Sequence, residues 1–140
     1  MRTDELAVDY IEQAERTLEE AKNSIDNEVY SLGIRRSQET VELSLKAALR
    51  YLAIEYPRDH NVSDILLIAK ERRPVPNWFK EKIEFMASVS SDLARKRGPA
   101  FYGDERTLTP ASRLFTKEDS LRALTDAKEI FKICKRLIKH

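Results

Sequence analysis

The sequence predicts an all-α protein, an antiparallel up-and-down bundle of about five helices. Apolar residues recur every three or four positions over long segments, as on one face of an α-helix, and no strand-like alternation competes with this pattern. Only 3 of the 140 residues are glycine and 5 are proline, while 35% are charged, which is typical of long solvated helices. The length and the hydrophobic fraction of 41% suit one core, so we expect a single domain over residues 1–140.

The first helix is predicted to run from residue 4 into the region 23–27, with Thr3 as its cap. Its core-facing positions repeat with a helical period and comprise Leu6, Tyr10, Ala14, Leu18, Ala21 and Ile25. The second helix is predicted to begin near residue 29 or 31 and to end at residue 55, because Pro57 disfavours helical geometry at the residue before it.

A short third helix is predicted over residues 62–70. Asn61 is its expected cap, and Asp64 stands three residues on, as in a capping box. The fourth helix is predicted from residue 76 or 77 to residue 97. Gly98-Pro99 then gives a strong stop signal, since glycine and proline commonly follow the end of a helix.

The fifth helix is predicted to start at Thr116, with Asp119 as the reciprocal capping residue, and to last almost to the C-terminus. Cys134 falls on its apolar face, where we expect a buried small hydrophobe. The connection over residues 98–115 is longer than packing requires. Such connections are usually functional, bound to a partner or disordered.

The net charge of +1 gives no overall attraction to nucleic acid or membrane, so electrostatic recognition would depend on local patches. Residues 1–28 carry nine acidic and three basic side chains, whereas the segment from Lys128 onward carries five basic residues and one acidic residue. We expect the first and last helices to pack near each other through these complementary faces. The alternative is that the basic segment binds a partner.

Several kinds of functional site are missing from the sequence. The chain has one cysteine and two histidines, and no spacing of these residues fits a metal site. No phosphate-binding glycine loop, dinucleotide fingerprint or nucleophile motif occurs, so we expect no cofactor. The single cysteine suits a reducing cytoplasm, and we expect neither a signal peptide nor a membrane span. Abundant Glu, Lys and Arg with few Asn and Gln are compatible with a heat-adapted source.

Glu42 and Lys46 lie one helical turn apart beside the apolar stripe of the second helix, and two interpretations are open. They form either an ordinary surface ion pair or the polar edge of a cleft. In the second case Lys46 and Arg50, one further turn along, would bind phosphate while Glu42 holds Lys46 in place. Arg35, near the start of the same helix, would add another phosphate contact.

Other polar and aromatic residues also have two interpretations. His60 either orients the turn before the third helix or contacts an anion at that helix N-terminus. Tyr102 and Phe101, in the predicted loop, either stack on a base or pin the loop to the bundle or to a second subunit. The basic residues 95–97 fit the negative end of the fourth helix better than a phosphate patch.

Four segments give a more specific indication. They are SQETVELSLKAAL in the second helix, DHNVSDIL at the third, a long loop with aromatic residues, and LFTKEDSLRALTDAKEIFKICKRL in the last helix. In this order and spacing they resemble HEPN domains, from about Asp9 to Leu137. The resemblance implies an antiparallel helical bundle, usually a symmetric dimer, with a link to nucleotides or RNA. Many such proteins pair with a minimal nucleotidyltransferase in toxin and antitoxin modules, and others are metal-independent ribonucleases with an Arg-x4-6-His motif.

This chain lacks that ribonuclease motif, because no arginine lies five to seven positions before His60 or His140. RNA cleavage then loses its plausible catalysts, an imidazole beside an arginine that stabilises the phosphate charge. The hypothesis is a noncatalytic nucleotide- or RNA-binding homodimer that acts with a minimal nucleotidyltransferase. The alternatives are a module that binds only protein and, less favoured, a degenerate ribonuclease. In the leading hypothesis the site is one cleft. Arg35, Lys46 and Arg50 contact phosphate, Glu42 orients Lys46, and His60 and Tyr102 line the cleft.

Overall fold

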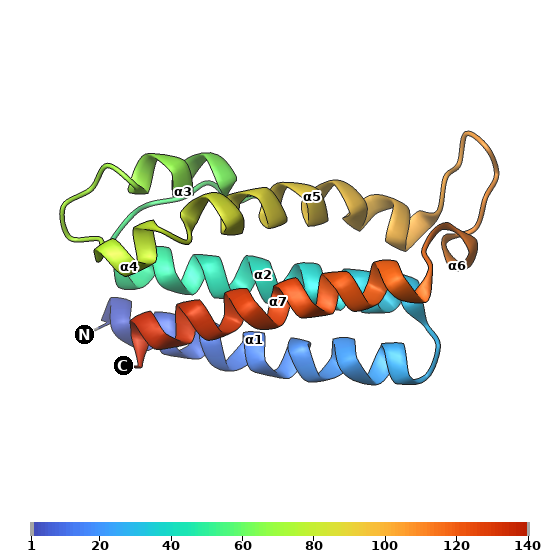
Figure 1. Cartoon of the computed structure of the whole chain (residues 1–140), viewed down its shortest axis with the longest axis horizontal. Coiled ribbons are helices and arrows are strands. Elements are labelled where there is room, and N and C mark those ends of the chain that lie inside the picture. The colour runs from blue at the N-terminus through green and yellow to red at the C-terminus, as the bar shows by residue number, and fades with distance from the viewer. Residues whose placement is uncertain (1, 140) are drawn as a thin grey trace.

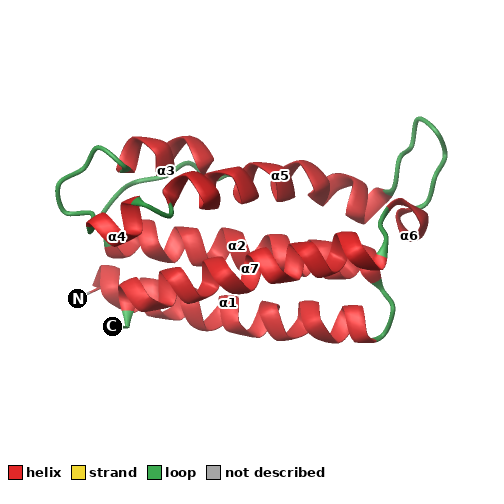
Figure 2. Ribbon diagram, viewed as in Figure 1, coloured by secondary structure: helices red, strands yellow, loops and turns green. Residues whose placement is uncertain are grey.

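Four long helices, each antiparallel to the next, form the body of the molecule (Figure 1). This computed structural model describes the backbone of residues 2–139 and the side chains of residues 5–139, so the predicted cap Thr3 and the terminal His140 lie outside the described side chains. Within residues 2–139 no β-strand occurs, and the all-helical prediction is confirmed (Figure 2). The long helices are α1 (Arg2–Asp26), α2 (Tyr30–Tyr51), α5 (Ile83–Tyr102) and α7 (Lys117–Ile138), and the short ones are α3 (Ser63–Ala69), α4 (Asn77–Lys80) and α6 (Ala111–Leu114).

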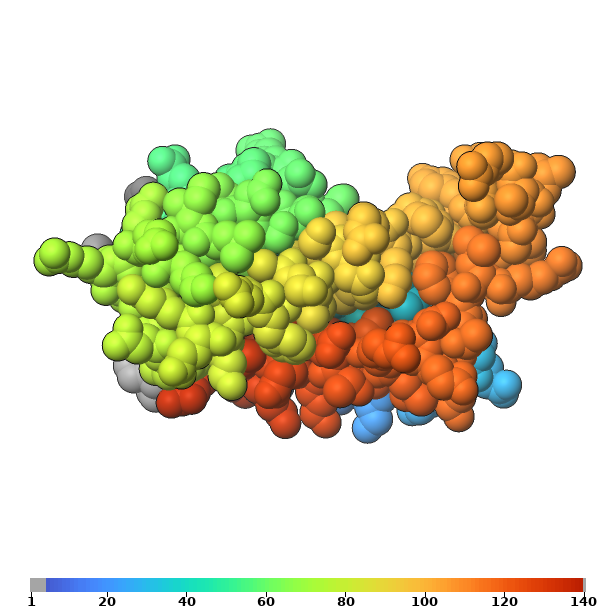
Figure 3. Space-filling model, turned by 45° about the horizontal axis from the view of Figure 1, so that its top comes forward, coloured from blue at the N-terminus to red at the C-terminus, as the bar shows by residue number. Residues whose placement is uncertain are grey.

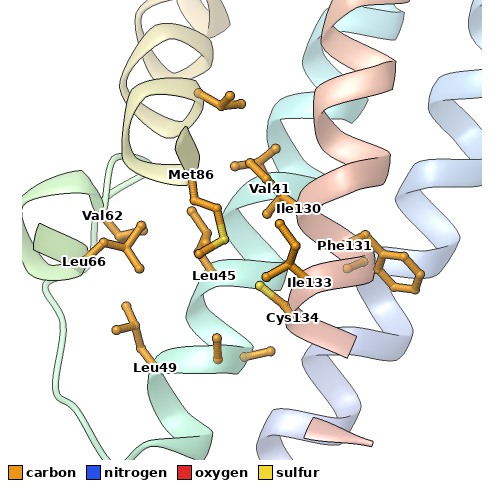
Figure 4. Packing of buried hydrophobic residues seen from close by; sticks show 14 of the residues in the cluster. Val41, Leu45, Leu49, Val62, Leu66, Met86, Ile130, Phe131, Ile133 and Cys134 are labelled. Atoms are coloured by element: carbon orange, nitrogen blue, oxygen red, sulfur yellow. The ribbon is translucent and has the colours of Figure 1, made fainter. Parts of the chain in front are cut away.

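The helix α2 lies at the centre of the bundle and packs against α1, α5 and α7, while α1 also packs against α7 and α3 covers α5. Its apolar residues Val41, Leu45 and Leu49 point into the core, toward Met86 of α5 and Cys134 of α7 (Figure 4). Burial of Cys134 raises the pKa of its thiol, which therefore stays protonated and acts as a core residue, as predicted. One flank of α2, bounded by α1 and α5, remains for polar side chains.

The second helix ends at Tyr51, four residues before the predicted end. The chain turns at Ala53, whose φ of 59° lies in the left-handed region. Ala53 N–H donates to the Arg50 carbonyl, and Ile54 N–H donates to the Leu49 carbonyl at 2.8 Å, which is the hydrogen-bond pattern of a Schellman motif. Ile54 is buried and holds the turn against the core. The sequence has no glycine at this turn to signal the stop, so the prediction extended the helix to residue 55, before Pro57.

The predicted fourth helix is divided into α4 and α5, and its predicted stop at Gly98-Pro99 is wrong. Gly98 can stay helical before a proline because it has no Cβ to clash with the ring. Pro99 lies in the last turn of α5, where it removes only one helical hydrogen bond. The helix ends instead at Gly103, whose φ of 76° requires a glycine, and whose N–H donates to the Pro99 carbonyl at 2.8 Å.

The predicted capping box of the third helix does not form. The Asn61 side chain accepts a hydrogen bond from the Ser63 N–H at 3.0 Å, but Val62 occupies the cap position and makes no side-chain cap bond. The capping box of the last helix is confirmed. Thr116 accepts from the Asp119 N–H at 3.1 Å, and Asp119 accepts from the Thr116 N–H at 3.0 Å.

The predicted loop over residues 98–115 is largely ordered by local structure. Its first five residues continue α5, and α6 occupies part of its end. Between them, Asp104 and Thr109 exchange two backbone hydrogen bonds of 2.8 and 2.9 Å and close a tight loop. This segment projects from one end of the bundle (Figure 3). Among the described helices, none combines the length and apolar character needed to cross a membrane.

Candidate functional site

A row of polar side chains follows the flank of α2 between α1 and α5. Its members are spaced three or four residues apart, so they share one side of the helix. We call this row the α2 stripe, and its members are Arg35, Glu39, Glu42, Lys46 and Arg50.

Glu42 is the centre of the stripe, because three side chains donate hydrogen bonds to it or pair with it. Lys46 Nζ lies 2.8 Å from one carboxylate oxygen, and Gln38 Nε2 and His60 Nδ1 lie 3.0 and 2.7 Å from the other. The side chains of Lys46 and Glu42 are only 14% and 17% exposed. Glu42 and Lys46 therefore form a largely buried pair, which differs from the surface ion pair considered as one interpretation of the sequence.

The surroundings of Glu42 act on its pKa in opposite directions. Burial raises the pKa, because it disfavours the charged form. The hydrogen bonds from Lys46, Gln38 and His60 favour the carboxylate, and together with the positive charge of Lys46 they outweigh burial. The net result is a pKa below the ordinary value of a glutamate, so Glu42 is ionised at neutral pH.

Arg97 of α5 joins the same network from the other side of the flank. Its Nη1 donates to Gln38 Oε1 at 2.7 Å and lies 3.4 Å from Glu39 Oε2. Arg36 bridges Glu39 and Glu20 of α1 at 2.9 and 3.2 Å. Arg97 was predicted to act mainly at the end of its own helix, and the buried Gln38 was not predicted at all.

Arg50 lies at the C-terminal end of the stripe in an aromatic setting. Its guanidinium carbon is 5.6 Å from the ring centroid of Tyr10 in α1 and 5.4 Å from that of Tyr56. The Nε atom is buried and has no hydrogen-bond partner. Arg50, Tyr56 and Arg58 help to line an open pocket of about 390 Å³. Neither tyrosine was predicted as a site residue, because their contact with Arg50 joins separate segments of the chain.

Arg35 and Tyr102 lie at the opposite end of the stripe. The Arg35 guanidinium carbon is 3.8 Å from the ring centroid of Phe101, and the Phe101 and Tyr102 centroids are 4.7 Å apart. Arg35 Nε is also buried without a partner, and the Tyr102 residue is 70% exposed. Burial, with the charge of Arg36 adding to it, lowers the pKa of Arg35. A guanidinium remains charged at neutral pH in spite of this shift.

The structure therefore divides the predicted site residues into two groups. Glu42, Lys46, Arg50 and His60 lie together, whereas Arg35 and Tyr102 do not reach them. Arg35 and Arg50 are fifteen residues apart in one helix, which corresponds to about 22 Å. His60 and Tyr102 consequently do not line a single small cleft, although the α2 stripe connects their surroundings.

Comparison with known proteins agrees with this architecture. The family model described as "HEPN domain" matches residues 7–137. A protein of Methanocaldococcus jannaschii named "Putative toxin MJ1304" is 29% identical over 134 residues, which cover 93% of this chain and 86% of that protein.

Two solved structures are also similar. The crystal structure of TT1696 from Thermus thermophilus has a TM-score of 0.75 at 24% identity, and this likeness concerns the fold alone. The structure of ST0689, described as an archaeal HEPN homologue, has a TM-score of 0.69 at 25% identity. Each match covers 94% of this chain and 97% of the other. Because the family model spans nearly the whole sequence, this chain belongs to the HEPN domain family.

Proposed function

We propose that this HEPN protein is a noncatalytic RNA-binding component of a toxin and antitoxin type module in the cytoplasm. In this proposal it acts as a homodimer together with a minimal nucleotidyltransferase. The name of the Methanocaldococcus jannaschii relative supports the type of module. The observation that carries the binding function is the α2 stripe, with an arginine held against aromatic rings at each of its ends.

Neither of the two terminal arginines of the stripe, Arg35 and Arg50, is paired with a carboxylate among the described residues. The Arg50 guanidinium interacts instead with the side chains of Tyr10 and Tyr56. Lys46 carries a further charge, which Glu42 orients and partly offsets. A guanidinium without a carboxylate partner can bind a phosphate through charge-assisted hydrogen bonds.

The length of the stripe favours RNA over a single nucleotide. A mononucleotide is too short to contact both Arg35 and Arg50, about 22 Å apart along the helix. A single strand of several nucleotides spans that distance, and proteins that bind such strands combine a positive track with aromatic side chains on which bases stack. Phe101 and Tyr102 supply exposed rings at the Arg35 end.

The test is fluorescence anisotropy with a labelled ten-nucleotide single-stranded RNA at modest salt. We expect the double variant Lys46→Ala, Arg50→Ala to bind at least tenfold more weakly than wild type. Loss of two phosphate contacts should also reduce the slope of log affinity against log salt by about 1.4. The matched control is Arg72→Ala, Arg73→Ala, which removes two exposed charges outside the stripe.

Three outcomes distinguish the possibilities. If the stripe variant and the control variant bind RNA with equal affinity, the α2 stripe is not the RNA-binding surface. ATP that competes as strongly as the RNA would indicate a single-nucleotide site in the pocket beside Arg50. Absence of binding to either probe would leave a protein-binding module as the function of this chain.

A second candidate function rests on one specific contact. His60 Nδ1 lies 2.7 Å from Glu42, and a carboxylate that orients an imidazole is an arrangement used in acid–base catalysis. A degenerate ribonuclease would cleave RNA in the presence of a chelator and lose this activity in His60→Ala. Cleavage that persists in this variant would exclude His60 as its source.

A further inference from the structure

A groove between α1 and α7 lies on a different face of the molecule from the α2 stripe. It has a volume of about 390 Å³, and its apolar lining comprises Leu18, Ile25, Leu121, Leu124 and Phe131. Leu121 is 39% exposed although it is a large hydrophobic residue. The groove follows α7 from Leu121 to Phe131, which corresponds to about 15 Å along the helix axis. An apolar channel of this length is open to a ligand with an extended apolar edge.

The two walls of the groove carry opposite charges. The α1 wall contributes the carboxylates of Glu15, Glu19 and Asp26, together with one base, Lys22. The α7 wall contributes Lys128. Among the described residues, none of these five side chains forms an ion pair or a side-chain hydrogen bond.

The α7 wall extends further as a basic surface. The ammonium of Lys135 lies 5.6 Å from the ring centroid of Phe131, at the end of the apolar lining. Beyond that end, Glu12 of α1 forms an ion pair with Lys139 at 3.5 Å. Along the groove itself, the charged side chains of the two walls named above form no such pair. The charges therefore flank an apolar floor without neutralising each other.

We propose that this groove binds one amphipathic helix of a partner protein. The helix has an apolar stripe, a basic flank that faces the carboxylates of α1, and an acidic flank that faces Lys128 of α7. This is the helix-in-groove mode of recognition, in which apolar side chains at positions i, i+4 and i+7 enter the channel. The 15 Å of lining accommodates about ten residues of such a helix.

Different side chains of α1 contribute to this surface and to the candidate RNA-binding stripe. Tyr10 and Glu20 face α2 and contact Arg50 and Arg36. Glu15 and Glu19 line the groove instead. The groove proposal consequently goes beyond the proposed RNA-binding function and does not depend on it.

The experiment uses three synthetic fourteen-residue helical peptides and isothermal titration calorimetry with the full chain. The first peptide has a leucine stripe with lysines on one flank and glutamates on the other. The second has the same stripe with glutamates on both flanks, and the third keeps the charges of the first but replaces the leucines with glutamine. We expect saturable binding of the first peptide, at least tenfold weaker binding of the second and none of the third.

Two variants locate the binding site. Leu121→Glu should weaken binding of the first peptide at least tenfold, and Lys128→Glu should weaken it severalfold without changing the apolar floor. The matched control is Leu67→Glu on α3, since Leu67 is 45% exposed and far from the groove in the sequence. Circular dichroism and the unfolding midpoint show whether each variant is folded. If Leu121→Glu does not fold, Lys128→Glu still tests the location of the binding site.

Three results would overturn the proposal. The first is failure of the first peptide to bind, and the second is equal loss of binding in Leu67→Glu. The third is a wild-type dimer in sedimentation velocity that Leu121→Glu dissociates, because a second copy of the chain would then cover the groove. RNA binding is measured separately with the stripe variants, so its failure is distinguishable from failure here.

Discussion

The carboxylate of Glu42 receives contacts from Lys46, His60 and Gln38, and two of these three residues lie one turn to either side of it on α2. A largely buried carboxylate is stable in its charged form only when such partners compensate for lost hydration. Because His60 comes from the connection after α2, the same carboxylate also fixes the position of that connection. Replacing the charge should therefore affect stability as well as ligand binding.

For Glu42→Gln we expect a loss of about 2 kcal/mol in the free energy of unfolding at neutral pH, because a charged acceptor loses its hydrogen bonds. The pKa of Glu42 is lower in the folded chain than in the unfolded chain. The ordinary pKa of a glutamate, about 4.3, applies to the unfolded chain. The stabilisation of the folded state by the Glu42 carboxylate is therefore fully present above that pH, and it is lost as the pH falls through the lower pKa of Glu42 in the folded chain. Urea unfolding of both proteins between pH 3 and 6 measures this difference.

The control for that series is Glu105→Gln, which makes the same change in the exposed loop. Its effect should not follow the same pH dependence. A difference between wild type and Glu42→Gln that stays constant over this range would contradict the role assigned to the network.

The sequence indicated which polar side chains of α2 lie next to each other, but not which residues of other segments contact them. Glu42 and Lys46 are recognisable because their spacing brings them together on any helix. The contact of Arg97 with Gln38 joins residues 59 positions apart, and no local pattern contains that information. Arg35 and Tyr102 were joined to the rest of the site because all six candidates were expected in one cleft, but the length of α2 separates them.

Among the helices, Gly33 of α2 marks a close approach to α1 and α7. A Cβ at this position would overlap the Ser120 hydroxyl and lie 2.7 Å from Ile25 Cγ1. The Ser120 hydroxyl also donates to the Tyr30 carbonyl at 2.9 Å, so it cannot move away without losing that bond. The glycine is therefore required by packing rather than by its backbone conformation.

We expect Gly33→Ala to destabilise the protein by about 1 to 3 kcal/mol, because overpacking forces neighbouring side chains apart. The control is Gly98→Ala, where a Cβ would meet no atom within 4 Å apart from those of its own helix backbone and its two chain neighbours. That substitution should change the free energy of unfolding by less than about 1 kcal/mol, because the lower backbone entropy of alanine in a helix opposes the contact of its Cβ with the ring of Pro99. Denaturant unfolding of the two variants compares them, and equal effects would refute the packing argument.

The turn after α2 also affects the stability of the protein. Ala53 adopts a left-handed conformation that glycine adopts without steric cost. We expect Ala53→Gly to raise the free energy of unfolding by about 1 kcal/mol. Ala94→Gly, in the interior of α5, should lower it by about the same amount, and thermal unfolding measures both. A destabilising effect of Ala53→Gly would show that its methyl group makes a packing contribution larger than the strain.

The presence of each long helix could be predicted from the spacing of its apolar residues. The residues at which helices end were harder to predict, because some of these ends depend on contacts between distant parts of the chain. Thr116 and Asp119 lie within one turn of each other, so the reciprocal cap was readable. The end at Ala53 depends on burial of Ile54, a tertiary effect without a glycine to announce it. At Gly98-Pro99 the helix continues, because Gly98 has no Cβ that would clash with the ring of Pro99. The helix stops instead at Gly103.

At the scale of the whole molecule, the bundle presents two separate surfaces, to which different side chains of α1 contribute. Lys46→Ala, Arg50→Ala should leave affinity for the amphipathic peptide within twofold of wild type. Leu121→Glu should likewise leave RNA affinity unchanged, because distant sites without shared partners act additively. Combining anisotropy and calorimetry on each variant tests this independence. A large effect of either substitution on the other ligand would indicate a shared site or a change in the fold.

The order of the helices along the chain has a kinetic consequence. A turn of only three residues joins α1 to α2, whereas the bond between Ser120 and Tyr30 connects residues 90 positions apart. Contacts between neighbours in sequence form early in folding, because they require little loop closure. We therefore expect the α1–α2 hairpin to be formed at the transition state and α7 to dock afterwards. Ser120→Ala, which removes the bond from α7 to Tyr30, would then accelerate unfolding far more than it slows folding, and a chevron plot would reveal this.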